Sequence, residues 1–297
     1  MAIRVSGLYR HPVKSLGGEA LSTLDITTNG PVGDRYWAVL DGESGRIRNA
    51  KRWPRLLLLT AAFVKPPQPD AYDGDVTHVE MTAPDGSRCR SDDGDCDAWL
   101  SHQLGRPARL AARRPAYCRE HYRLGGPRTA DEIAADIDLQ PGEPFPDYHL
   151  DEGDFLAQLL DHETPPGSYA DAYPIHILSG NALRSLARRS GLDAGAPRFR
   201  PNIVVDIDPD DAEPESEGDA PEQAWTGRRL RIGSLVLNLV SPTTRCSMPA
   251  RPQPLLGVKP EPALTRAMVQ LCNRTVGLNA LIETPGTISC GDEVQLL

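Results

Sequence analysis

The feature that most constrains this chain is a series of short strand-like segments separated by turn-forming residues, and in the first of them apolar and polar residues alternate. The first spans residues 3–9, and His11-Pro12 follows it directly. Further segments lie at 36–41, 56–64 and 76–83, separated by Asp-Gly and Pro-Pro turns. Alternation with a period of two is typical of half-buried strands. The first part of the chain is therefore predicted to be a small β domain.

The second half repeats this pattern but includes a helix. Strand patterns are found at 172–178, 202–207, 230–240 and 282–297. Ser179 follows the first of them as a helix N-cap, a helix is predicted over 181–190, and Gly191 ends it. The second half is therefore predicted to be β-rich, with one strand, cap and helix unit.

The remaining segments have weaker patterns. An amphipathic helix is predicted over 95–104, and residues 113–166 form a connection with weak helical pieces near 130–137 and 154–160. The acidic, proline-broken run 206–222 is predicted to be a solvated insertion. At 297 residues the chain has room for about two domains.

Composition and charge exclude several classes of function. The formal net charge of −9 disfavours nucleic acid or an anionic membrane as a partner, because a phosphate-rich surface would be repelled. The N-terminus lacks the apolar core of a signal peptide and no segment is apolar enough to cross a membrane, so a cytoplasmic location is predicted. The six cysteines are too scattered for a disulfide framework and are predicted to be reduced.

One cysteine has the sequence context of a reactive thiol. Cys246 follows Arg245 in a loop after an apolar strand, and a neighbouring cation with partial exposure favours thiolate chemistry. A small buried hydrophobe is the alternative for any single cysteine. No role is assigned to the cysteines at 89, 96, 272 and 290. A zinc site using Cys118 and His121, joined by Cys89 and Cys96, is disfavoured because the usual short paired spacing of ligands is absent.

Basic clusters recur at loops despite the acidic composition. Lys14 and Ser15, with Arg35 and Arg200, offer charged and bidentate donors for a compact anion, although each alone is more often a surface group. His176 lies in an apolar strand and is predicted to be a hydrogen-bonded core histidine. No phosphate-binding glycine loop, nucleophile elbow or zinc-protease motif is present, which disfavours the common hydrolases, kinases and dehydrogenases.

Taken together, these segments resemble the MOSC superfamily, in particular its amidoxime-reducing molybdenum-cofactor proteins. The carrying segments follow in the family's order: LYRHPVKSLGGEAL (8–21), VGDRYWAVLD (32–41), WPRLLLL (53–59), ADAYPIHILSGNAL (170–183), RFRPNIVVD (198–206), AWTGRRLRIGSLVLNL (224–239), TTRC (243–246) and PGTISCGDEVQLL (285–297). The resemblance implies a mainly β fold with α/β elements. An N-terminal β-barrel-like domain over 1–115 and a connecting segment over 116–166 would precede a MOSC β-barrel domain over 167–297.

The resemblance also implies a site and a reaction. Cys246 would be the catalytic residue and the protein ligand to molybdenum. Molybdopterin-binding residues would be Lys14, Ser15, Arg35, Ser179, Arg200, Asn202, Thr244 and Arg245. The implied function is a molybdenum-cofactor oxidoreductase that reduces small N-hydroxylated or N-oxide substrates.

Three departures from the family pattern qualify this expectation. Lys51 stands where relatives usually have arginine, residues 247–257 differ from the usual sequence after the ligand cysteine, and no C-terminal cysteine cluster for an iron–sulfur centre is present. Electrons are therefore expected from a separate donor protein. Two alternatives stay open: sulfur transfer through a Cys246 persulfide, and storage of the molybdenum cofactor without turnover.

Overall fold

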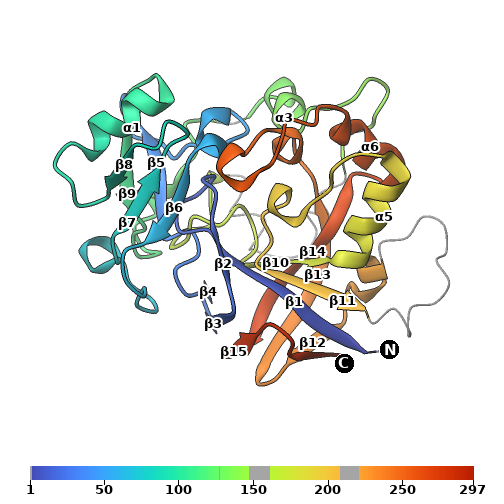
Figure 1. The fold of residues 1–297 in the computed structure, drawn as a ribbon. Coiled ribbons are helices and arrows are strands. Elements are labelled where there is room, and N and C mark those ends of the chain that lie inside the picture. Colours follow the sequence, from blue (N-terminus) through green and yellow to red (C-terminus); the bar gives the residue numbers. More distant parts are fainter. Residues whose placement is uncertain (1, 127, 147–160, 208–220) are drawn as a thin grey trace.

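The architecture was established from a computed structural model, which describes residues 2–126, 128–146, 161–207 and 221–297 (Figure 1). Seven strands form a closed barrel, since β1 pairs with both β11 and β16 at the two ends of the strand order. The barrel strands are β1 (Ile3–Arg10), β11 (Ile203–Ile207), β10 (Ile175–Ser179), β14 (Thr275–Thr284), β13 (Leu235–Thr244), β12 (Arg229–Ile232) and β16 (Glu293–Leu296). The short strand β2 (Glu19–Leu21) pairs antiparallel with the last residues of β1.

The alternating patterns explain the barrel interior. Ile3 and Val5 of β1 are buried while the residues between them are exposed, and Leu230 and Ile232 of β12 repeat this pattern. Because successive side chains of a strand point to opposite faces, one face of each strand fills the barrel core. The prediction of β strands at both ends of the chain is confirmed.

One parallel pair supplies the α/β element. Strands β10 and β11 are parallel and are joined by helix α5 (Gly180–Ser190). The Ser179 side chain accepts a hydrogen bond from the Ala182 backbone N–H, and Gly191 ends the helix in the left-handed conformation at φ +70°. The predicted cap, helix and stop are confirmed. Helix α6 (Ala263–Cys272), which the sequence patterns did not predict, packs beside α5 on the outside of the barrel (Figure 1).

The beginning of the chain is built into the second half. Besides β1, strand β3 (Thr23–Thr27) pairs with β15 (Gly286–Ser289) and with β4 (Gly30–Pro31). Leu24 and Ile26 lie in the same hydrophobic core as the barrel strands. The predicted boundaries at 115 and 166 stay predictions, and the strand pairing interlocks the segments that they separate.

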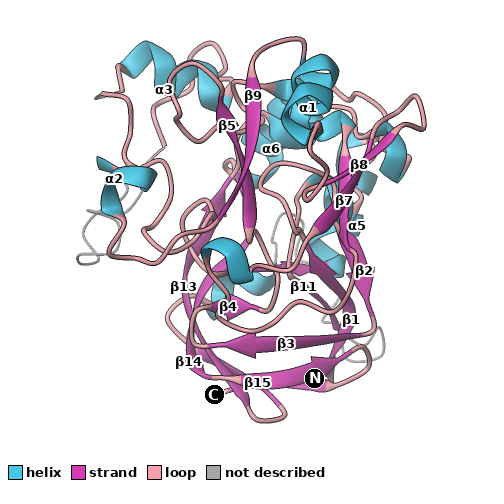
Figure 2. Cartoon of the chain, turned by 90° about the vertical axis from the view of Figure 1, so that its left-hand side faces the viewer, coloured by secondary structure: helices cyan, strands magenta, loops and turns pink. Residues whose placement is uncertain are grey.

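A second body with its own core lies above the barrel in Figure 2. Its elements are β5 (Trp37–Asp41), β9 (Ala108–Ala112), β6 (Thr60–Phe63), β7 (Val79–Thr82), β8 (Arg88–Arg90) and α1 (Cys96–Leu104). The predicted strand at 56–64 begins instead as a 3-10 turn over Pro54–Leu58, because proline supplies no backbone donor. The predicted helix at 95–104 is confirmed as α1, with Leu100 buried.

The connecting segment adds two short helices, α2 (Arg119–Tyr122) and α3 (Ala130–Ile137). Thr129 and Glu132 close α3 with a capping box. The helical piece predicted at 154–160 and most of the acidic run at 206–222 lie outside the described residues.

Short 3-10 turns also occur at Asp73–Asp75, Ala196–Arg198, Pro221–Trp225, Met248–Ala250 and Pro254–Leu256. In the described part of the chain, none of the helices combines the length and apolar character needed to cross a membrane. The mainly β fold with α/β elements, containing a barrel, is confirmed.

Candidate functional site

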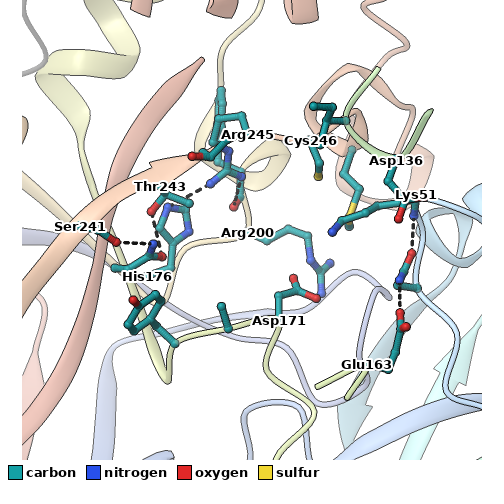
Figure 3. A pocket seen from close by; sticks show the side chains of 18 of the residues that line it. Lys51, Asp136, Glu163, Asp171, His176, Arg200, Ser241, Thr243, Arg245 and Cys246 are labelled. Carbon is teal, nitrogen blue, oxygen red and sulfur yellow. Dashed lines mark hydrogen bonds between the residues drawn. The ribbon is translucent and has the colours of Figure 1, made fainter. Parts of the chain in front are cut away.

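A cavity of about 550 Å³ lies where three parts of the chain meet. Arg35 and Lys51 come from the N-terminal part, Arg128 and Asp136 from the connecting segment, and the ends of barrel strands complete the wall. Figure 3 shows that the Cys246 thiol, the Lys51 ammonium and the Arg200 guanidinium point into the same open space. The cavity therefore gathers cationic side chains around one thiol.

Cys246 follows the last residues of β13 and is half-buried. The adjacent Arg245 backbone is fixed by a hydrogen bond from its N–H to the Arg274 carbonyl, at 2.9 Å. Of the six cysteines, all of them described, Cys246 alone lines the cavity. The prediction that this thiol faces an opening rather than packed hydrocarbon agrees with the structure.

Arg200 is held in the cavity wall by its backbone and by the N-terminal segment. Its φ of +55° is unusual for a residue with a side chain, and its guanidinium donates to the Leu16 carbonyl. The second terminal nitrogen, NH2, is buried and has no hydrogen-bond partner among the described residues. Burial, together with the nearby Arg35 guanidinium, lowers the pKa of Arg200 to about 9.

Arg245 is fixed by three contacts with two neighbours, Phe199 and His176, on the barrel side of the cavity. It donates to the Phe199 carbonyl at 3.0 Å, and its guanidinium lies over the Phe199 ring at 5.2 Å. It also approaches His176 Nε2 at 3.2 Å. Because a guanidinium can only donate, the His176 nitrogen must be the acceptor. Burial and the charge of Arg245 lower the pKa of His176 well below its ordinary value, which keeps the ring neutral.

His176 is thus both hydrogen-bonded, as the sequence predicted, and part of the cavity wall. Around it, Asn279 donates to the Ser241 hydroxyl at 3.2 Å and accepts from Thr243 at 3.0 Å. These four residues form a neutral, hydrogen-bonding end of the cavity. In Figure 3, His176, Ser241 and Thr243 lie on the far side of Arg200 from Lys51.

Asp171 is the carboxylate that faces the cations. The Lys14 ammonium forms an ion pair with it and also donates to the Tyr169 carbonyl at 3.1 Å. Burial alone would raise the pKa of Asp171, but Lys14, Lys51 and Arg35 outweigh that effect and lower it strongly. Asp171 is therefore ionised.

Six of the nine predicted site residues line the cavity: Arg35, Arg200, Asn202, Thr244, Arg245 and Cys246. The other three lie behind the wall. Lys14 positions Asp171, the Ser15 hydroxyl accepts a hydrogen bond from the Ala50 backbone at 3.0 Å, and Ser179 caps α5. Their contacts with a cofactor stay predictions, and in the structure each acts through a neighbour.

The connecting segment contributes a wall that no sequence pattern indicated. Asp136 lies at the end of α3, and Arg128 donates to Glu163 at 2.6 Å. Lys51, noted in the sequence only as a departure from arginine, also lines the cavity. Burial would lower the pKa of Lys51, but negative charge at Cys246 and Asp171 outweighs it, and the pKa is raised.

Arg274 holds this wall against the loop that carries Cys246. It is 2% exposed, pairs with both carboxylate oxygens of Glu143, and donates to the Ile137 carbonyl at 2.6 Å and the Arg245 carbonyl at 3.1 Å. The Ser247 hydroxyl donates to the Asp136 carbonyl at 3.3 Å. The connecting segment is therefore an integral part of the cavity.

Several buried donors at the cavity lack a partner. Asn202 Nδ2, Arg200 NH2 and Arg245 Nε have none among the described residues. Leaving a buried donor unpaired costs about 1–3 kcal/mol. A ligand rich in acceptor oxygens would pair these groups, and the cations favour a negatively charged one. A thiol beside such a ligand suits a soft metal. The donor set therefore fits an anionic pterin dithiolene that carries molybdenum.

This chain matches two family models and is similar to several known proteins. Residues 2–107 match the model of the MOSC N-terminal beta barrel domain, and residues 164–295 match that of the MOSC domain. Mitochondrial amidoxime-reducing component 1 of Homo sapiens is 28% identical over 331 residues, which cover 99% of this chain and 82% of that protein. Its Mus musculus counterpart is 26% identical over 324 residues, with 99% and 82% covered. Molybdenum cofactor sulfurase of Drosophila grimshawi is 23% identical over 297 residues, covering 97% of this chain but 34% of that protein.

Proposed function

Because this chain belongs to the MOSC superfamily, we propose that it is a molybdenum-cofactor oxidoreductase that reduces small N-hydroxylated or N-oxide compounds. Its relatives make it a molybdenum-cofactor-related protein, and three of them are named for amidoxime reduction. The single observation that carries the proposal is the set of unpaired buried donors on Asn202, Arg200 and Arg245, around a cavity that one thiol enters.

The chain's own residues would bind and orient the cofactor. Cys246 would provide the thiolate ligand to molybdenum. Arg200, Arg245 and Asn202 would donate to the anionic and carbonyl oxygens, and Lys51 would balance the negative charge near the sulfur. When bound, the cofactor supplies the two-electron redox chemistry that removes oxygen from nitrogen.

Asp171 and the connecting segment would shape the substrate's side of the cavity. The Asp171 carboxylate, held by Lys14, is an acceptor for a substrate N–H or O–H group. Asp136, Arg128 and Glu163 line the wall of the cavity that the connecting segment provides. Electrons would come from a separate donor protein, and the cytoplasmic location stays a prediction.

The test uses protein from a host that makes the cofactor. Molybdenum content, oxidised-pterin fluorescence, and reduction of an aryl amidoxime by a reduced viologen dye are measured together. Cys246→Ala should abolish turnover, and Cys118→Ala, a half-buried thiol outside the cavity, should not. Equal turnover by Cys246→Ala would refute the assignment.

A matched pair of arginine variants tests the anion-binding wall. Arg200→Ala should lower the pterin content of the purified protein. Arg184→Ala removes an arginine whose side chain is 59% exposed and paired with Asp206 on the barrel exterior, and it should leave the pterin content unchanged.

Sulfur transfer is the second candidate, favoured by the similarity to molybdenum cofactor sulfurase. It requires a persulfide at Cys246 that cyanide releases as thiocyanate, and it requires no bound molybdenum. Cofactor storage instead predicts bound molybdenum with no reductase activity on any N-oxygenated substrate.

A further inference from the structure

Two cysteines and two aspartates meet in the loop between β8 and α1, in the sequence CRSDDGDC at residues 89–96. Cys89 and Cys96 are 4% and 5% exposed. The thiol sulfur of Cys89 lies 3.6 Å from an Asp93 carboxylate oxygen, and the ligand atoms of Cys89, Asp93 and Asp95 all lie within 4.8 Å of one another. None of these residues lines the Cys246 cavity.

The second thiol lies against the first. Cys96 is the first residue of α1, and its side chain contacts the Cys89 sulfur. The loop is tied by backbone hydrogen bonds, from the Arg90 N–H to the Asp93 carboxylate at 2.7 Å and from the Cys96 N–H to the Asp93 carbonyl at 3.1 Å. Two buried sulfurs and two carboxylates are therefore held in one small, well-ordered turn.

The charge of this turn is uncompensated. The Arg90 guanidinium donates two hydrogen bonds to the Asp92 carboxylate. Among the described residues, neither Asp93 nor Asp95 forms an ion pair with a lysine or arginine. Asp95 is the N-cap of α1, yet its side chain makes no capping hydrogen bond. A bound cation would neutralise these two carboxylates.

We propose that this loop is a binding site for zinc, with Cys89, Asp93 and Asp95 as ligands and the Cys96 sulfur as the fourth. Zinc takes four tetrahedral ligands, with sulfur at about 2.3 Å and carboxylate oxygen at about 2.0–2.2 Å. The ligand atoms of Cys89, Asp93 and Asp95 lie within 4.8 Å of one another and need only a small contraction to meet this geometry, whereas the Cys96 sulfur would have to turn further toward them to complete the set. The two sulfurs favour zinc over calcium or magnesium, which prefer oxygen.

On binding, each cysteine would lose its thiol proton to water and keep the electron pair as the donor to zinc, so no oxidant is required. The ion would fasten the N-terminus of α1 to β8. Sequence spacing alone did not indicate this site, because two of its ligands are aspartates between the cysteines rather than further cysteines or histidines.

The test is metal binding by the full-length protein, prepared reduced and stripped with a chelator. We expect one equivalent of zinc in a Cys246→Ser background, which removes the thiol of the other site. Cobalt should give the absorption bands of thiolate coordination there. Asp93→Asn and Cys89→Ser should weaken zinc at least about tenfold.

The matched control is Asp92→Asn, which removes a neighbouring aspartate that is paired with Arg90 and is not a proposed ligand. It should bind zinc like the parent. No zinc retained by the folded parent, or the same affinity in Asp93→Asn as in Asp92→Asn, would overturn the proposal. A mass that is lower by two hydrogen atoms under non-reducing conditions, together with failure to bind zinc, would also overturn the proposal, because Cys89 and Cys96 would then form a disulfide.

Discussion

Glu222 offers a quantitative test of the packing behind β10. It lies in the 3-10 turn Pro221–Trp225, is 0% exposed, and among the described residues neither carboxylate oxygen has a well-formed hydrogen bond. Burial raises its pKa from the ordinary 4.5 to about 7, against weaker opposing effects of nearby backbone donors and the Ser179 hydroxyl. At about 1.4 kcal/mol per pKa unit, a difference of about 2.5 corresponds to about 3 kcal/mol.

The sign of the pH effect follows from proton binding. The folded chain keeps the proton to a higher pH than the unfolded chain does. The stability that this carboxyl contributes is therefore fully present below about pH 4.5 and is lost as the pH rises to about 7. Glu222→Gln removes the ionisation, so it should be more stable than the parent at pH 8, by up to about 3 kcal/mol.

The assay is urea unfolding of parent and Glu222→Gln from pH 4.5 to pH 8. The difference between their unfolding free energies should grow with pH in this window and then level off. Glu43→Gln, at an exposed glutamate, is the control and should show no such trend. A difference between parent and Glu222→Gln that does not change with pH would refute the argument.

Three further variants test the packing of the connecting segment, of the barrel and of the first core. Arg274→Met leaves the buried Glu143 carboxylate unpaired and should lower the unfolding free energy by about 3–5 kcal/mol; an unchanged urea midpoint would contradict it. Gly277→Ala places a Cβ 2.5 Å from the Ile177 carbonyl at φ +85° and should cost more than about 1 kcal/mol, seen as a lower melting temperature. Leu56→Ala, at a fully buried position of the first core, should cost about 2–5 kcal/mol in urea unfolding, and a loss below 1 kcal/mol would show that the site is not packed as described.

The sequence predicts elements well where local chemistry decides them. Ser179 and Gly191 delimit α5 because a side-chain acceptor and a left-handed glycine satisfy helix ends locally. Helix α6 escapes such reasoning, since Pro262 at its N-cap makes no side-chain hydrogen bond and Asn273, not glycine, ends it. The family-derived prediction that Cys246 and the arginines share one site agrees with the cavity.

The rest of the site depends on tertiary contacts. Asp136 and Glu163 reach the cavity because Arg274 and the Ser247 hydroxyl hold the connecting segment in place, and these contacts join residues more than 100 positions apart. Lys14 carries a motif typical of ligand binding, yet it is turned inward to hold Asp171. Spacing along the chain does not reveal which side of a wall a side chain occupies.

The first strand of the chain has a consequence for how the protein is made. Strand β1 is synthesised long before its partners Val294 and Glu293, which lie about 290 residues later in the sequence. Although β11 can pair with one edge of β1 earlier, the barrel cannot close before β16 is made, so the nascent chain carries an unfinished sheet edge until then. A fragment that starts at residue 164 would lack β1, the strand that closes the barrel. We expect it to aggregate under conditions in which the chain that includes β1 folds.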